Sequence, residues 1–462
     1  MEVPEQSIPE PVEETRVPPR SQSLSYAAVI LVLAGVLVML CLGVVESNEQ
    51  KTQVWRNAVV VAEGKPFWDG VIPARFRMIR EEDGPFYPLV QEILKQPNGA
   101  EILKDWRFDM REYVVAVSMP DSEWAPLVES GRVPEPGKPE VLAGPMCRFD
   151  RFTLDGVEFK VVGKLQRGTA GLSFAYLLPD SGDVMRLFED SRGATHGWID
   201  KDASNREWTD AQQSDESTRV LLASTPAQPM IARGVFVGLL FVILGGAILQ
   251  VRLLQAFCRR TRIFATLIDS THTHARLFRA VHICCYGALL LLMMIGFAFP
   301  LVHRLALLMV NDLFTRGDLA YIGNAYMSQN ILHATVATFI NNYIVQTLSI
   351  TMIPSLLVPI WGLLKTMLNL AIAGFVLAPV YTDIALRFAF HSITVSLEVE
   401  AYVIAAYATL LYGVHLYRGL TKGSFTQGAI LASKIMLEAV ALTGILLFIA
   451  AGYEAVTLIL MS

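Results

Sequence analysis

The sequence predicts a polytopic α-helical membrane protein of about seven transmembrane helices, with an α+β extracytoplasmic domain between helices 1 and 2. Three observations lead to this prediction. The chain of 462 residues is 53% hydrophobic and has a mean hydropathy of +0.42. Several uncharged stretches approach the roughly 20 residues that a helix needs to cross a bilayer. A long stretch of ordinary composition, 46–230, separates the first of them from the others.

The N-terminal part of the chain predicts a tail followed by a membrane anchor. Residues 1–22 are rich in Pro and Glu and contain little to bury, so we expect a disordered cytoplasmic tail. The apolar run at 23–45 is longer than the apolar core of a typical signal peptide, and no clear cleavage site follows it. We therefore interpret 23–45 as an uncleaved transmembrane helix 1.

Segment 46–230 predicts one folded extracytoplasmic domain. Short runs of β-branched and aromatic residues lie between turn residues at 111–119, 152–166 and 172–180, which indicates strands. Apolar and charged residues alternate along VEFKV at 157–161, as in a strand with one buried face. Segment 85–106 has a helical pattern, so the domain is predicted to be α+β. Its single cysteine, Cys147, cannot close a disulfide within the domain.

Residues 231–462 predict a six-helix transmembrane bundle. The expected spans are 231–251, 280–302, 331–352, 355–380, 389–416 and 428–459. Pro354 and Pro359 break helices, so 352–360 is either a loop or a re-entrant turn. The amphipathic segment 305–314 is expected to lie along the outer interface as a short helix.

The distribution of Arg and Lys predicts the orientation in the cytoplasmic (inner) membrane. Segment 252–279 holds one acid, Asp269, and six arginines: Arg252, Arg259, Arg260, Arg262, Arg276 and Arg279. Short loops rich in Arg and Lys stay on the cytoplasmic side. The basic residues of 417–427 and of the N-terminal tail agree with this assignment. Residues 46–230 and the C-terminus should then lie outside.

Polar side chains are predicted at membrane depth in the last third of the chain. This intramembrane polar cluster comprises Asn341, Asn342, Gln346, Lys365, Asn369, His391, Glu398, Glu400 and Glu454. A carboxylate at the bilayer centre costs a few kcal/mol, so it must be neutral, paired, or turned toward protein or water. The cluster is therefore expected to lie inside the bundle, either as interhelical contacts or as the lining of a polar conduit.

Helical geometry separates the two neighbouring acids of this cluster. Glu398 and Glu400 are rotated by about 200° from each other on an ideal helix, whereas His391 and Glu398 lie on nearly the same face. The two acids should therefore meet different neighbours. Lys434 and Glu438, four residues apart, are expected to form an intrahelical ion pair. Small residues that allow close helix packing in lipid are Gly374, Ala401, Ala405, Gly413 and Gly444.

No motif in the sequence assembles a catalytic site. Nucleophile-elbow, zinc-protease and Walker A patterns are absent, and His196 fits a solvated loop. The two histidines of Thr-His-Thr-His at 271–274 are too few to hold a metal. The chain lacks the Lys/Arg-rich tract of a nucleic-acid-binding protein. We therefore expect no enzymatic activity, no cofactor, no metal and no nucleic-acid partner.

Four ordered motifs between about 330 and 460 resemble the stage II sporulation protein M family of integral membrane proteins. They are FINNYIVQTL, WGLLKTMLNLAIAG, SLEVEAYVIAAYATLLYG and LLFIAAGYEAVTL. The matching positions are Asn341 or Asn342, Asn369 with Gly374, Glu398 with Ala401, Ala405 and Gly413, and Glu454 after Ala450. The family usually has a histidine four residues before the matching glutamate, where this chain has Thr394. The resemblance implies a membrane scaffold or assembly protein that organises partner proteins at the bacterial cytoplasmic membrane.

A second resemblance concerns about 110–180. Gly-Arg-x-Pro-x-x-Gly-x-x-Glu-Val at 131–141 and Phe-x-Val-Val-Gly at 159–163 look like the extracytoplasmic core domain of MacB/FtsX-type ABC permeases. This resemblance implies the alternative function, a permease or accessory subunit of an ABC-type export system. Its ATPase would dock on 252–279. The expected partners are the lipid bilayer and other membrane or cell-envelope proteins, an ABC ATPase under the alternative, with homo-oligomerisation left open.

Overall fold

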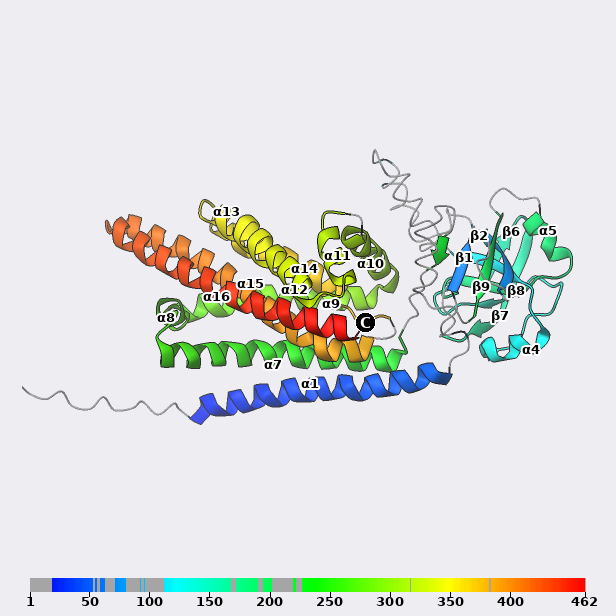
Figure 1. Ribbon diagram of the computed structural model, residues 1–462, viewed down its shortest axis with the longest axis horizontal. Coiled ribbons are helices and arrows are strands. Elements are labelled where there is room, and N and C mark those ends of the chain that lie inside the picture. The colour runs from blue at the N-terminus through cyan, green and yellow to red at the C-terminus, as the bar shows by residue number, and fades with distance from the viewer. Residues whose placement is uncertain are drawn as a thin grey trace, which may run out of the picture.

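The protein consists of a long helical bundle and a sheet domain at one end of it (Figure 1). The computed structural model describes residues 19–52, 55, 59–62, 71–79, 92, 95, 112–167, 172–189, 194–201, 219–221, 227–315, 317–381 and 384–461. Almost all of the helix expected at 85–106, and residues 1–18 of the expected tail, lie outside the described residues.

Within the residues that the structure describes, six helices are long and apolar enough to cross a membrane, which makes the chain a multi-pass membrane protein by length and composition. They are α1 (Pro19–Thr52), α7 (Pro229–Thr261), α9 (Ala275–Ala298), α12 (Ile331–Phe339) with its π-helical continuation η4 (Ile340–Met352), α15 (Ile384–Thr421) and α16 (Phe425–Met461). The remaining predicted span, 355–380, corresponds to the shorter helix α14 (Ile360–Val376).

Short helices connect the long ones. They are α8 (Ala265–Thr273), α10 (Pro300–Thr315), α11 (Ala320–Met327) and α13 (Ile353–Ser355). Pro300 begins α10, so α9 ends earlier than the expected span 280–302, and α10 contains the amphipathic segment 305–314. Between Pro354 and Pro359 the chain makes a turn before α14 begins. An interruption of the helices is therefore present in this region, but Pro354 itself lies within α13, and the turn follows it.

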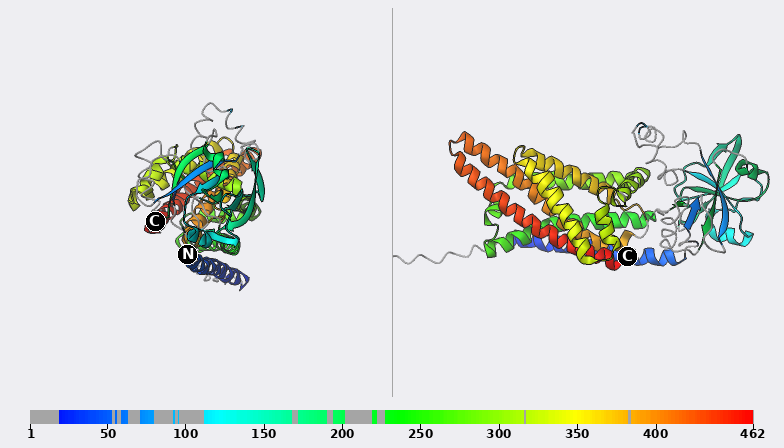
Figure 2. Two further views of the ribbon diagram at one scale, coloured as in Figure 1. Left: turned by 90° about the vertical axis from the view of Figure 1, so that its right-hand side faces the viewer. Right: turned by 45° about the horizontal axis from the view of Figure 1, so that its top comes forward.

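The helices run back and forth along the bundle. Figures 1 and 2 show the start of α1, the end of α7, α8 and the α15–α16 turn at one end. The sheet domain lies at the other end, toward which the C-terminus also points. The arginine-rich segment 252–279 and residues 417–427 thus share the end opposite the sheet.

Helix α15 is the centre of the bundle. It packs against α1, α7, α9, α14 and α16. Along 399–409 every residue is buried except the half-buried Tyr402. A helix surrounded by protein has no lipid-facing side over this stretch, so polar side chains on it can be satisfied by its neighbours.

The described part of the sheet domain contains a ten-stranded sheet whose order is β10-β1-β9-β2-β3-β8-β5-β7-β4, with β6 paired to β7. The strands are β1 (Val59–Ala62), β2 (Ile72–Met78), β3 (Tyr113–Val117), β4 (Val128–Gly131), β5 (Glu140–Ala143), β6 (Arg151–Leu154), β7 (Val157–Leu165), β8 (Ala175–Pro179), β9 (Ala194–Asp200) and β10 (Arg219–Leu221). Short helices, α4 (Asp121–Trp124), η2 (Ala125–Leu127), η3 (Asp183–Met185) and α5 (Arg186–Glu189), complete it. The three segments predicted as strands form β3, β6 with β7, and β8.

Both faces of the sheet are covered. Val115 and Val117 of β3 belong to one apolar cluster, and Val114 and Ala116 belong to another. Strand β7 changes faces along its length, because the pairing with β5 shifts between Val141 and Leu142. A Cβ at Gly163 would lie 2.8 Å from the carbonyl oxygens of Arg132 and Ser130. The predicted alternation therefore holds only up to this irregularity.

The Gly-Arg-x-Pro turn is held by an ion pair. The Arg132 guanidinium donates two hydrogen bonds to the Glu140 carboxylate, at 2.7 and 2.5 Å. This hydrogen bonding from Arg132 lowers the pKa of Glu140. The backbone amide of Glu135 donates to the same carboxylate at 3.1 Å. The motif thus closes the connection from β4 to β5.

Candidate functional site

The two acids on the middle of α15 face different helices, as their rotation predicts. Asn342 of η4 donates from Nδ2 to Glu398 Oε1 at 2.8 Å. Asn341 Nδ2 donates to Asn342 Oδ1 at 3.0 Å, and Tyr321 OH donates to Asn341 Oδ1 at 3.3 Å. A chain of hydrogen bonds therefore links α11, η4 and α15 through Glu398.

The π-helical turns of η4 place these asparagines. The hydroxyls of Thr347, Ser349 and Thr351 each donate to the carbonyl oxygen five residues earlier, at 2.6 to 2.8 Å. Hydroxyls in an α-helix reach back three or four residues instead. The i−5 pattern satisfies the widened backbone turns, and such turns often occur at functional sites.

Glu454 of α16 belongs to the same region as Glu398. The two carboxyl groups interact electrostatically, and Tyr326 of α11 and Tyr402 of α15 lie near both of them. The Tyr326 hydroxyl is also 3.1 Å from Thr338 Oγ1 of α12. Glu398, Glu454, Asn341 and Asn342, all predicted, are therefore brought together by α11, α12–η4, α15 and α16.

Glu400 forms a separate site with α9. Its side chain is fully buried. His282 Nε2 is 3.1 Å from Glu400 Oε1, and Tyr286 OH donates to Glu400 Oε2 at 3.0 Å. His282 Nδ1 is 2.9 Å from the carbonyl oxygen of Phe278. Both carboxylate oxygens of Glu400 thus have a partner on α9.

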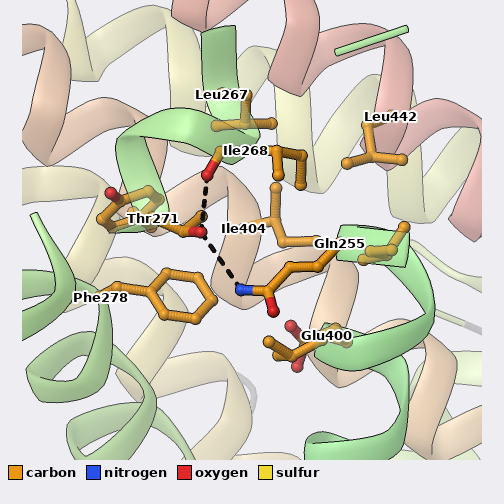
Figure 3. Close-up of a pocket in the computed structure, with 11 residues that line it drawn as sticks. Gln255, Leu267, Ile268, Thr271, Phe278, Glu400, Ile404 and Leu442 are labelled. Carbon is orange, nitrogen blue, oxygen red and sulfur yellow. Dashed lines mark hydrogen bonds between the residues drawn. The ribbon is translucent and has the colours of Figure 1, made fainter. Parts of the chain in front are cut away.

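A small pocket adjoins Glu400 (Figure 3). Its lining comes from α7, α8, α9, α15 and α16, and the labelled residues are Gln255, Leu267, Ile268, Thr271, Phe278, Glu400, Ile404 and Leu442. Gln255 Nε2 donates to Thr271 Oγ1 at 3.4 Å. The free space, about 20 Å³, holds little more than one water molecule. The pocket is therefore too small in this state for an organic substrate.

Other predicted polar residues lie apart from these two groups. Lys365 Nζ donates to Asn369 Oδ1 at 2.8 Å, but both lie on α14. No hydrogen bond joins His391 to Glu398, and His391 Nδ1 is buried without a hydrogen-bond partner. Gln346 contributes its backbone carbonyl to Thr351. The predicted cluster is thus divided among several local contacts.

His282 and Tyr286 were not among the residues predicted for the site. They are four residues apart and share a face of α9, so the available signal was a pair of polar groups at helical spacing within an apolar span. The expected ion pair between Lys434 and Glu438 is wrong. Glu438 instead accepts a hydrogen bond from the backbone amide of Leu267, in the first turn of α8, at 2.7 Å. A carboxylate at a helix N-terminus satisfies an otherwise free amide.

The arginines of 252–279 lie at the end of α7, in its connection to α8 and at the start of α9. Arg260, Arg262, Arg276 and Arg279 are exposed, and Arg252 is half-buried. Arg259 lies within α7. The exposed guanidinium groups form a basic surface at the end of the bundle opposite the sheet.

Within the part of the chain that the structure describes, no group of three or more His, Cys, Asp or Glu residues could hold a metal ion. Comparison with protein-family models, curated proteins and solved structures finds no match for this chain.

Proposed function

We propose that this chain is a non-enzymatic membrane scaffold or assembly protein of the stage II sporulation protein M type. It would organise partner proteins at the bacterial cytoplasmic membrane. The arginine-rich segment 252–279 would face the cytoplasm, and the sheet domain would lie outside. Partners would be other membrane or cell-envelope proteins, and no nucleic acid, metal or cofactor is required.

The observation that carries this proposal is the engagement of the buried acids by neighbouring helices. Glu398 accepts from Asn342, and both oxygens of Glu400 contact α9. Interhelical hydrogen bonds of this kind contribute roughly 1 kcal/mol each and specify which helices adjoin. The pocket beside Glu400 leaves room for about one water. These features suit a bundle that holds one arrangement more than a path for a bulky substrate.

The second candidate is a permease or accessory subunit of an ABC-type exporter. Two features favour it. A sheet domain follows the first long helix, and exposed arginines at the opposite end offer a docking surface for an acidic face of an ATPase. In that case the small pocket would belong to a closed state.

Site-specific photo-crosslinking in cells separates the two functions. A crosslinking amino acid is placed at Glu158, exposed on β7, and in a second variant at Arg276, exposed at the start of α9. The scaffold predicts cell-envelope proteins captured at Glu158 and no ATPase at Arg276. An ATPase captured at Arg276, with ATP hydrolysis lost in an Arg260→Glu, Arg276→Glu variant, would establish the exporter instead.

A further inference from the structure

The contact between His282 and Glu400 requires a proton. His282 Nδ1 lies 2.9 Å from the Phe278 carbonyl oxygen. A carbonyl oxygen only accepts hydrogen bonds, so Nδ1 must carry the hydrogen of that bond. In a neutral imidazole the other nitrogen, Nε2, then has a lone pair and no hydrogen.

The partner of Nε2, a carboxylate oxygen, also lacks a hydrogen to donate when Glu400 is ionised. Glu400 Oε1 lies 3.1 Å from Nε2, and an ionised carboxylate only accepts. If His282 were neutral and Glu400 ionised, two lone pairs would face each other at a fully buried side chain. Buried acceptors without a donor cost about 1–3 kcal/mol or more. One additional proton removes the conflict, either as imidazolium with carboxylate or as imidazole with carboxylic acid.

We propose that His282 and Glu400 together form a binding site for one proton, and that this proton joins α9 to α15 inside the bundle. The site is neutral in either arrangement, which suits a surrounding with little water. Loss of the proton leaves one negative charge and two opposed acceptors, so the α9–α15 contact weakens. The proposal goes beyond the scaffold and does not depend on it.

The neighbouring groups leave the charge balance intact. From α9, Tyr286 donates to Glu400 Oε2, and Cys285 interacts electrostatically with Glu400. Helix α7 presents Gln255 to the pocket, α8 presents Thr271, and α16 presents Leu442, all uncharged (Figure 3). The nearby Glu438 of α16 accepts from the Leu267 amide. Tyr407 of α15 lines the same pocket and donates to the Ser270 carbonyl oxygen, and Lys365 of α14 donates to Asn369. Among the groups that contact Glu400, none is a cation other than His282 that could neutralise it.

A small pocket separates Glu400 from α8. Glu400 lines it, and the opposite wall includes Leu267, Ile268 and Thr271 of α8. Helix α8 lies at the end of the bundle that carries the arginine-rich segment (Figure 1). The pocket therefore lies on the side of Glu400 that faces α8.

Spectroscopy of the full chain in detergent micelles at neutral pH tests the proton directly. The ¹⁵N signals of labelled histidines report the charge of His282, which the His282→Gln variant assigns. The infrared difference between wild type and Glu400→Gln reports whether Glu400 is a carboxylic acid or a carboxylate. We expect imidazolium with carboxylate or imidazole with carboxylic acid. A neutral His282 beside an ionised Glu400 would overturn the proposal.

The pH dependence of unfolding provides a second measurement. Above about pH 7.5 an unfolded chain holds almost neither proton, because free His, with a pKa near 6.5, is then largely neutral and free Glu is ionised. The folded chain binds one proton more, so stability must fall as the pH rises. While the folded chain keeps its proton, the ratio of unfolded to folded wild type should rise with pH. Divided by the same ratio for Glu400→Gln, it should increase by a factor of about ten per pH unit.

The Glu400→Gln variant is informative because its side-chain amide can donate to Nε2 without a titrating proton. The matched control is His303→Gln. His303 of α10 contacts the Val376 carbonyl oxygen through Nε2. The pH dependence of unfolding of His303→Gln should equal that of wild type. Both should differ from that of Glu400→Gln. Equal pH dependence in wild type and Glu400→Gln would contradict a shared proton.

Discussion

At the scale of single residues, Asn342 shows how the membrane-depth acids are accommodated. Its side-chain amide both donates and accepts a hydrogen bond: Nδ2 donates to Glu398, and Oδ1 accepts from Asn341. An uncharged donor can satisfy a carboxyl group whether or not that group is ionised. The requirement for a buried partner was predictable from the acid alone. The choice of Asn342 from the predicted candidates depended on which helix lies beside α15.

A double-mutant cycle measures this contact. We compare Asn342→Leu, Glu398→Gln and the double variant by thermal unfolding in detergent micelles. Asn342→Leu should lower stability, since Glu398 loses its hydrogen-bond donor on η4, and the coupling between the two sites should be about 0.5–1.5 kcal/mol. Additive effects within about 0.3 kcal/mol would show that the contact does not stabilise the fold.

At the scale of elements, α9 and α14 pack closely because Gly374 has no side chain. A Cβ at Gly374 would overlap the carbonyl oxygen of Leu289, so the two backbones are in direct contact. Gly374 was one of the small residues expected to permit such an approach. The π-helical form of η4 was not expected. The hydroxyl spacing of Thr347, Ser349 and Thr351 accompanies it, but the same residues also occur in ordinary helices.

Replacing Gly374 by Ala should separate α9 from α14. The clash is with backbone atoms, which cannot rotate away, so we expect a loss of about 1–3 kcal/mol in the free energy of unfolding. Gly287→Ala on α9 is the matched control, because a Cβ there meets nothing within 4 Å. It should be neutral or slightly stabilising through helix propensity. Equal effects of both variants on thermal unfolding would refute a packing role for Gly374.

At the scale of the whole molecule, the basic residues and the sheet domain lie at opposite ends of the bundle (Figure 1). Segments 252–279 and 417–427 share one end, as the charge distribution predicts. An orientation with the arginines in the cytoplasm and the sheet domain outside requires this separation. The orientation itself stays a prediction.

Cysteine labelling tests the orientation. In a background with all five native cysteines replaced, Glu158→Cys and Lys422→Cys each provide one exposed thiol. A membrane-impermeant maleimide should label the first variant in intact cells and the second only after the membrane is disrupted, because basic loops resist translocation. Labelling of Lys422→Cys in intact cells would reverse the topology.

The sequence by itself determined the class of this protein, because long apolar stretches and proline breaks are local features that a bilayer and a backbone constrain directly. It also determined that Glu398 and Glu400 diverge, since helical rotation is the same in every helix. Only the tertiary structure decided which groups meet them. Glu400 contacts His282, which lies 118 residues away in the sequence, and Glu438 contacts Leu267, which lies 171 residues away. Such contacts depend on how the helices pack.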